Sequence, residues 1–124
     1  MVQPRGAAQR SPFLVFSDNP PPPMKEAVQI FRRAKVVVGM HGAGLANAVF
    51  APEGTHLLEF ALPQPATNCY AHLAMAMGFC YWQVRVLDGG AHGRQHSSVD
   101  AEEVVDTLAR IMACASKPDA HCPA

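Results

Sequence analysis

The sequence predicts a small α/β domain in which a mostly parallel sheet carries helices on both faces. Short apolar runs alternate along the chain with longer segments whose apolar residues recur at helical spacing. The run Val36–Val38 is continuous rather than alternating, which is typical of strands buried on both faces in parallel sheets. Strands and helices that alternate in this order favour a doubly wound sheet of about four parallel strands.

The expected elements follow from apolar spacing and from turn residues. The strands are short apolar runs bounded by turn signals: Pro12–Phe16, Lys35–Gly39, His56–Phe60 and Tyr81–Leu87. The helices have apolar residues three or four positions apart: Met24–Ala34, Leu45–Ala51, a helix between Asn68 and Gly78, and one from Asp100 to Ala115. The domain is expected to span residues 12–116, between a disordered N-terminus at 1–11 and a disordered tail at 117–124.

Two helices have recognisable ends. Asn68 is expected to cap the first, with Gly78 as its C-terminal stop. Its apolar face is predicted from spacing and comprises Cys69, Leu73 and Met77. Asp100, followed three residues later by Glu103, has the form of a capping box. The apolar stripe predicted for that helix is Val104, Val105, Leu108, Ile111, Met112 and Ala115.

Length and composition fit one domain and exclude several classes of protein. The 124 residues are 49% hydrophobic and 16% charged, as is usual for globular chains. Ten basic and ten acidic side chains give a formal net charge of zero, so nothing indicates a nucleic acid partner. No apolar stretch approaches the ~18 residues of a membrane span, and no export signal is visible. The four cysteines lack CxxC spacing and leave the redox compartment open.

The turn His41-Gly42-Ala43-Gly44 lies between a buried strand and a short helix. The first turn of a helix presents unpaired backbone N–H groups, which suit a phosphate, and glycines that adopt positive φ let the anion come close. His41 can donate a further hydrogen bond or a charge. The spacing matches neither the P-loop nor the GxGxxG fingerprint. Either the turn binds phosphate, or its glycines serve packing alone.

Glu59 stands at the carboxyl end of the next strand, among leucine and phenylalanine. A buried carboxylate needs a partner, and in nucleotide-binding α/β folds such an acid often holds the ribose hydroxyls. The alternative is a glutamate at the rim of the sheet that is solvated or ion-paired. With the turn, the ribose interpretation suggests a nucleoside diphosphate.

The sequence argues against two other kinds of site, a zinc site and an esterase active site. His92 and His96 are four residues apart, but glycines flank them, so a solvated loop is favoured over a zinc pair. No Asp-x-Asp motif occurs, and no metal cofactor is expected. The HGAG turn is similar to the oxyanion loop of esterases, but the chain has no G-x-S-x-G nucleophile. A hydrolase is therefore excluded.

The stretch VVVGMHGAGLANAVFAPEGTHLLEF, with PMKEAVQIFRRA before it and CYAHLAMAMGFCYW after it, closely resembles the C-terminal part of glycosyltransferase family 61. That family includes plant xylan xylosyl- and arabinofuranosyltransferases and animal O-linked N-acetylglucosaminyltransferases of the secretory pathway. The resemblance covers residues 12–115. It implies a Rossmann-like domain that corresponds to the C-terminal, nucleotide-sugar-binding half of a GT-B enzyme.

The resemblance also implies site residues and partners. The donor diphosphate would contact His41, Gly42, Ala43, Gly44 and Leu45, and Asn47 is a weaker candidate. Glu59 would hold the ribose.

Further expectations concern the reaction and the compartment. The co-substrate would be a nucleotide sugar, a UDP-sugar by expectation, and the acceptor a glycan or glycoprotein hydroxyl in the full-length parent. The reaction would be inverting, with its base on the other half, and the compartment the Golgi or endoplasmic reticulum lumen. Because a full family domain is several times longer, the alternative is a non-catalytic nucleotide-binding fragment or degenerate copy.

Overall fold

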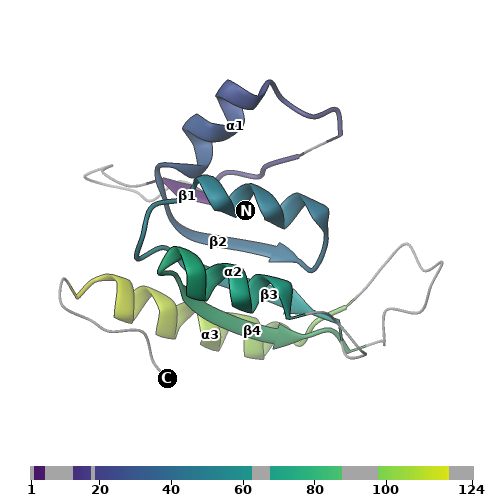
Figure 1. The fold of residues 1–124 in the computed structure, drawn as a ribbon. Coiled ribbons are helices and arrows are strands. Elements are labelled where there is room, and N and C mark those ends of the chain that lie inside the picture. The colour runs from purple at the N-terminus through teal and green to yellow at the C-terminus, as the bar shows by residue number, and fades with distance from the viewer. Residues whose placement is uncertain (1, 5–12, 18, 63–67, 88–97, 118–124) are drawn as a thin grey trace.

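The fold is an α/β domain with one small sheet, as the sequence predicts (Figure 1). The computed structural model describes residues 2–4, 13–17, 19–62, 68–87 and 98–117. In these residues the strands are β1 (Val2–Pro4), β2 (Ala34–Met40), β3 (His56–Ala61) and β4 (Cys80–Arg85). The helices are α1 (Met24–Phe31), the 3₁₀ helix η1 (Ala43–Phe50), α2 (Cys69–Met77) and α3 (Ala101–Ala115).

The described sheet has the order β1-β2-β3-β4. Strands β2, β3 and β4 are parallel, whereas β1 pairs with β2 in the antiparallel direction. Gly39 of β2 is in register with Glu59 of β3, which is in register with Gln83 of β4. The carboxyl ends of the three parallel strands therefore meet at one edge, where α/β sheets bind their ligands.

The first predicted strand is wrong. Residues 13–16 form no regular strand, and Phe13 and Val15 are 65% and 81% exposed. The segment lies outside the sheet, whose edge beside β2 is occupied by Val2–Pro4, residues that the sequence had assigned to a disordered N-terminus. Phe16 instead packs edge-to-face on Phe31 of α1, with ring centroids 5.0 Å apart. Apolar composition alone did not distinguish a strand from a segment that packs by one aromatic ring.

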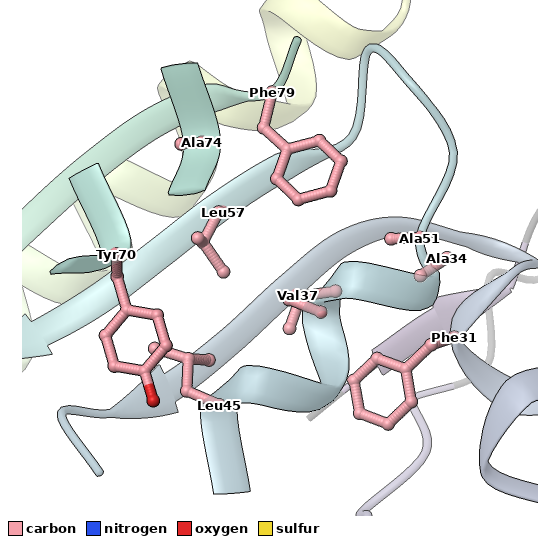
Figure 2. Packing of buried hydrophobic residues seen from close by; sticks show 10 residues of the cluster. Phe31, Ala34, Val37, Leu45, Ala51, Leu57, Tyr70, Ala74 and Phe79 are labelled. Carbon is pink, nitrogen blue, oxygen red and sulfur yellow. The ribbon is translucent and has the colours of Figure 1, made fainter. Parts of the chain in front are cut away.

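Each face of the sheet has its own core, because helices cover both. Helices α1, η1 and α2 pack on one face around Val37 and Leu57 (Figures 1 and 2). Helix α3 packs on the other face, where its Ile111 contacts residues such as Leu58 and Val84. Continuous burial of both faces explains why β2 and β3 have no alternating apolar pattern.

The helix faces differ in part from those predicted. In α2 the buried residues are Tyr70 and Ala74, and Cys69 is exposed. In α3 the predicted stripe was too wide, since Val105 is 66% and Met112 43% exposed. In α2 the predicted Leu73 and Met77 do pack against the core, partly buried, but the buried face is centred one residue away from the predicted one. In α3 the error came from counting every apolar residue at helical spacing, whereas the helix contacts the sheet along a narrower strip.

The helix ends agree better with prediction. Asp100 Oδ1 accepts hydrogen bonds from the backbone N–H of Glu102 and Glu103, so it caps α3. Gly78 ends α2 at φ 70°, in the left-handed region that favours glycine. Asn68 precedes α2 but makes no side-chain cap, so its predicted role there was wrong.

Candidate functional site

The turn after β2 is attached to the neighbouring strand. The backbone N–H of His41 donates to the carbonyl of Phe60 at 3.0 Å, which extends the pairing of β2 with β3 by one residue. The hydroxyl of Tyr70 in α2 donates to the carbonyl of Gly42. Two elements distant in sequence therefore hold the turn in place, so a ligand that binds there meets a largely pre-organised backbone.

The glycines of the turn do not adopt positive φ, so that expectation was wrong. Gly42 has φ 166°, an extended conformation open to any residue, and the positive-φ glycines among the described residues are Gly54 and Gly78. A Cβ at Gly42 would have no neighbour closer than 4.0 Å, whereas a Cβ at Gly39 would lie 2.9 Å from Leu45 Cδ1. Gly39 thus serves packing, and Gly42 leaves open space at the turn.

The short helix is a 3₁₀ helix, η1, rather than an α-helix. Asn47 Nδ2 donates to the carbonyl of Gly44 at 2.9 Å, a local side-chain bond of the kind that competes with α-helical pairing. The backbone N–H of Leu45 donates to Gly42. The N–H groups of Ala43 and Gly44 precede that bond and have no backbone partner in the part of the chain that is described.

His41 and Glu59 form a hydrogen-bonded pair at this edge of the sheet. His41 Nδ1 lies 2.5 Å from Glu59 Oε1, and the side chains are 18% and 4% exposed. The other carboxylate oxygen, Oε2, accepts a hydrogen bond of 2.6 Å from the hydroxyl of Tyr81. Each oxygen of the buried carboxylate thus has one donor, which satisfies the need of a buried charge for partners.

Two tyrosines contact this pair: Tyr70 contacts His41, and Tyr81 contacts Glu59. The ring of Tyr70 contacts that of His41 edge-to-face, with centroids 5.5 Å apart. Burial raises the pKa of the Tyr70 phenol, with further contributions from Cys69 and Glu59. Burial, and then the hydrogen bond to Glu59, also raise the pKa of the Tyr81 phenol. Both phenols therefore keep their protons at neutral pH and act as donors.

A pocket of about 280 Å³ opens beside the turn. The turn contributes His41, Gly42 and Gly44, and the edge of β2 contributes Gly39 and Met40. Its apolar wall contains the remaining lining residues, namely Phe16, Phe31, Val37, Val38 and Leu45. The lining thus combines polar backbone and an imidazole with aromatic and aliphatic side chains.

The predicted site residues fall into two groups. His41, Gly42, Gly44 and Leu45 line the pocket, Leu45 as part of the buried core (Figure 2). The others do not line it: Ala43, Asn47 and Glu59. Asn47 supports the turn, and Glu59 reaches the pocket only through His41.

Sequence reasoning missed both tyrosines. Tyr81 is in register with Leu57 and hence on the same face of the sheet as Glu59. Knowledge of the parallel register of β3 and β4 would have identified Tyr81 as a neighbour of Glu59. Tyr70 had been overlooked because the predicted helix face was shifted by one residue.

The described residues contain neither a candidate metal site nor a helix that could span a membrane. Among the residues described, no group of three His, Cys, Asp or Glu side chains could hold a metal ion. His92 and His96 lie outside the described residues. None of the helices in the described ranges has the length and apolarity needed to cross a membrane.

Comparison with known proteins agrees with the motif. The family model described as Glycosyltransferase 61 matches residues 6–58. This range includes β2 and the turn, and it ends one residue before Glu59. A relative from Drosophila melanogaster, named EGF domain-specific O-linked N-acetylglucosamine transferase, is 33% identical over 97 residues. The match covers 67% of this chain but 18% of the relative, so the chain spans less than a fifth of that protein. No solved structure matches the chain. The prediction from the HGAGL motif is thereby confirmed, and residues 6–58 belong to glycosyltransferase family 61.

Proposed function

We propose that the turn from Gly39 to Leu45 binds the diphosphate of a nucleotide-sugar donor in a glycosyltransferase. The observation that carries this proposal is the pocket at the carboxyl edge of the parallel strands, where His41, Gly42 and Gly44 form the polar wall. This edge is the usual ligand site of open α/β sheets. The family match supports a glycosyltransferase-type function, and the geometry supports the position of the donor within it.

The polar wall has suitable donors for an anion. The N–H groups of Ala43 and Gly44, which have no backbone partner among the described residues, lie at the start of η1, where helices have partial positive charge. His41 adds an imidazole whose Nε2 has no hydrogen-bond partner in the described part of the chain. The absence of a side chain at Gly42 leaves space for phosphate oxygens to approach.

The proposed donor and acceptor are those that the family resemblance implies. A nucleotide sugar, by proposal a UDP-sugar, would bind without a metal, and its sugar would pass with inversion to a glycan or protein hydroxyl. The matched relative is named as a transferase of N-acetylglucosamine to EGF domains. Because this chain spans 18% of that relative, acceptor binding and the catalytic base are assigned to parts of a longer parent. The second candidate function is donor binding without transfer.

One observation bears on the compartment. Cys80 is disulfide-bonded. Structural disulfides form and persist mainly in oxidising compartments. This bond supports the proposal that the parent protein works in the lumen of the secretory pathway, as the family resemblance implies.

Replacement of Gly42 by valine tests the proposal. Valine can adopt the extended φ of residue 42, and its Cβ would have no neighbour closer than 4.0 Å, so we expect the variant to fold. Its side chain projects where phosphate would approach, and binding of uridine diphosphate should weaken more than tenfold, about 1.4 kcal/mol or more. Calorimetric titration measures this. Ala76→Val, on the exposed side of α2, is the matched control and should bind as the wild type does. Equal affinity of Gly42→Val and wild type would contradict the proposal.

A further inference from the structure

We infer that Glu59 and Tyr81 are positioning residues for His41, and that Glu59 does not contact the ribose of the donor. The inference rests on the proposed function, because it specifies how the same site presents its imidazole to a phosphate. It departs from the role expected for Glu59 from sequence, and its evidence is the hydrogen-bond geometry around the buried carboxylate.

The first step concerns access to Glu59. The residue is 3% exposed and does not line the pocket. Its Oε1 is 2.5 Å from His41 Nδ1, and its Oε2 is 2.6 Å from the Tyr81 hydroxyl. A ribose hydroxyl would have to reach a carboxylate that is covered by the histidine on one side and the tyrosine on the other. The ligand that the pocket admits meets His41 first.

The second step concerns the proton on His41. An ionised carboxylate only accepts hydrogen bonds, so the ring nitrogen that faces Glu59 carries its proton. Nδ1 is therefore fixed as a donor, and the orientation of the ring is fixed with it. Nε2 is the ring nitrogen left for a ligand, and it donates to a phosphate oxygen when the ring carries its second proton.

The third step concerns support of the pair. The Tyr81 hydroxyl holds the second carboxylate oxygen and so prevents rotation of the Glu59 side chain away from His41. The edge-to-face contact of Tyr70 restricts the imidazole from the side of α2. Carboxylates that orient a histidine in this way are common where the opposite ring nitrogen acts on a ligand.

The decisive experiment compares two ligands, inorganic pyrophosphate and uridine diphosphate, on the full chain. If Glu59 acts through His41, Glu59→Gln should lower the affinity for both ligands by the same factor, because both ligands contain the phosphates that His41 would contact. Tyr81→Phe, which keeps the ring and removes only the donor, should weaken both by a smaller and again equal factor. Glu26→Gln, which removes an exposed carboxylate on α1, is the charge-matched control and should change neither. Selective loss of uridine diphosphate binding in Glu59→Gln would overturn the inference and restore the ribose contact.

A double-mutant cycle separates positioning from a merely structural role. In a His41→Ala background, Glu59→Gln should have no further effect on pyrophosphate affinity, since the group that it positions is gone. Additive losses would overturn the inference.

A spectroscopic measurement needs no ligand. Ring nitrogen resonances of His41, assigned by their absence in His41→Ala, should show a protonated Nδ1 in the wild type and a changed pattern in Glu59→Gln. Unchanged resonances would overturn the positioning role, whereas failure of the wild type to bind pyrophosphate would overturn the proposed function alone.

Discussion

Gly39 and Gly42 stand three residues apart in the same motif but meet different constraints. Gly39 lies where the end of β2 passes Leu45, and a Cβ there would be 2.9 Å from Leu45 Cδ1. Gly42 borders open space. Packing, one of the two interpretations that the sequence left open, therefore applies to Gly39, whereas Gly42 leaves the space that the proposed phosphate site needs.

Gly39→Ala is expected to lower the free energy of unfolding by about 1 kcal/mol. Overpacking of a core typically costs about 1–3 kcal/mol, and the reduced entropy of the unfolded chain offsets about 0.4–1 kcal/mol of that. Gly42→Ala, where no atom is near, should stay within about 0.5 kcal/mol of the wild type. Urea unfolding of the two variants checks the difference, and equal stabilities would show that Leu45 is not tightly packed against β2.

Because of Tyr81, the free energy of unfolding is expected to depend on pH in the alkaline range. Its phenol has a pKa raised above the ordinary 10.0 by burial and by Glu59. Above this ordinary value the unfolded chain loses a proton that the folded chain keeps, so the folded state binds more protons and stability falls as pH rises. Tyr81→Phe should remove part of that fall. The difference in unfolding free energy between wild type and variant should therefore shrink between about pH 8 and about pH 11. A difference that stays constant would show that the phenol titrates normally.

At the scale of elements, the helix ends at Asp100 and Gly78 were predictable, whereas the cap expected at Asn68 and parts of the buried faces were not. Asp100 could be recognised because a cap depends on two or three adjacent residues. The 3₁₀ geometry of η1 depends on the Asn47 side chain and on its neighbours in space, which spacing does not report. The edge strand β1 depends on pairing with β2, a long-range contact with little local signal.

Removal of the α3 cap should be measurable. Asp100→Ala leaves the N–H groups of Glu102 and Glu103 without their side-chain acceptor. The expected loss of stability is about 0.5–2 kcal/mol, read from urea unfolding. Asp100→Asn, which keeps an oxygen acceptor, should recover most of it. If both variants were equally destabilised, the charge near the helix dipole rather than the cap would be responsible.

At the scale of the molecule, the α/β class and the parallel direction of most strands could be predicted because burial on both faces leaves a clear apolar pattern. The candidate site was only partly predictable. The HGAG turn indicated the place of the proposed ligand, but the contact of Glu59 with Tyr81 depends on strand register, which sequence spacing does not determine. In the resulting arrangement Glu59 is buried and is hydrogen-bonded to both Tyr81 and His41. His41 and Gly42 in turn line the pocket.

The central claim is that the turn binds a diphosphate. Titration of the isotope-labelled chain with inorganic pyrophosphate, followed by backbone amide resonances, tests it most directly. We predict saturable shifts that concentrate at residues 39–45, are retained in His72→Ala, which alters an exposed histidine of α2, and are lost in His41→Ala. Shifts of equal size in His41→Ala, or shifts that centre outside this turn, would contradict the account.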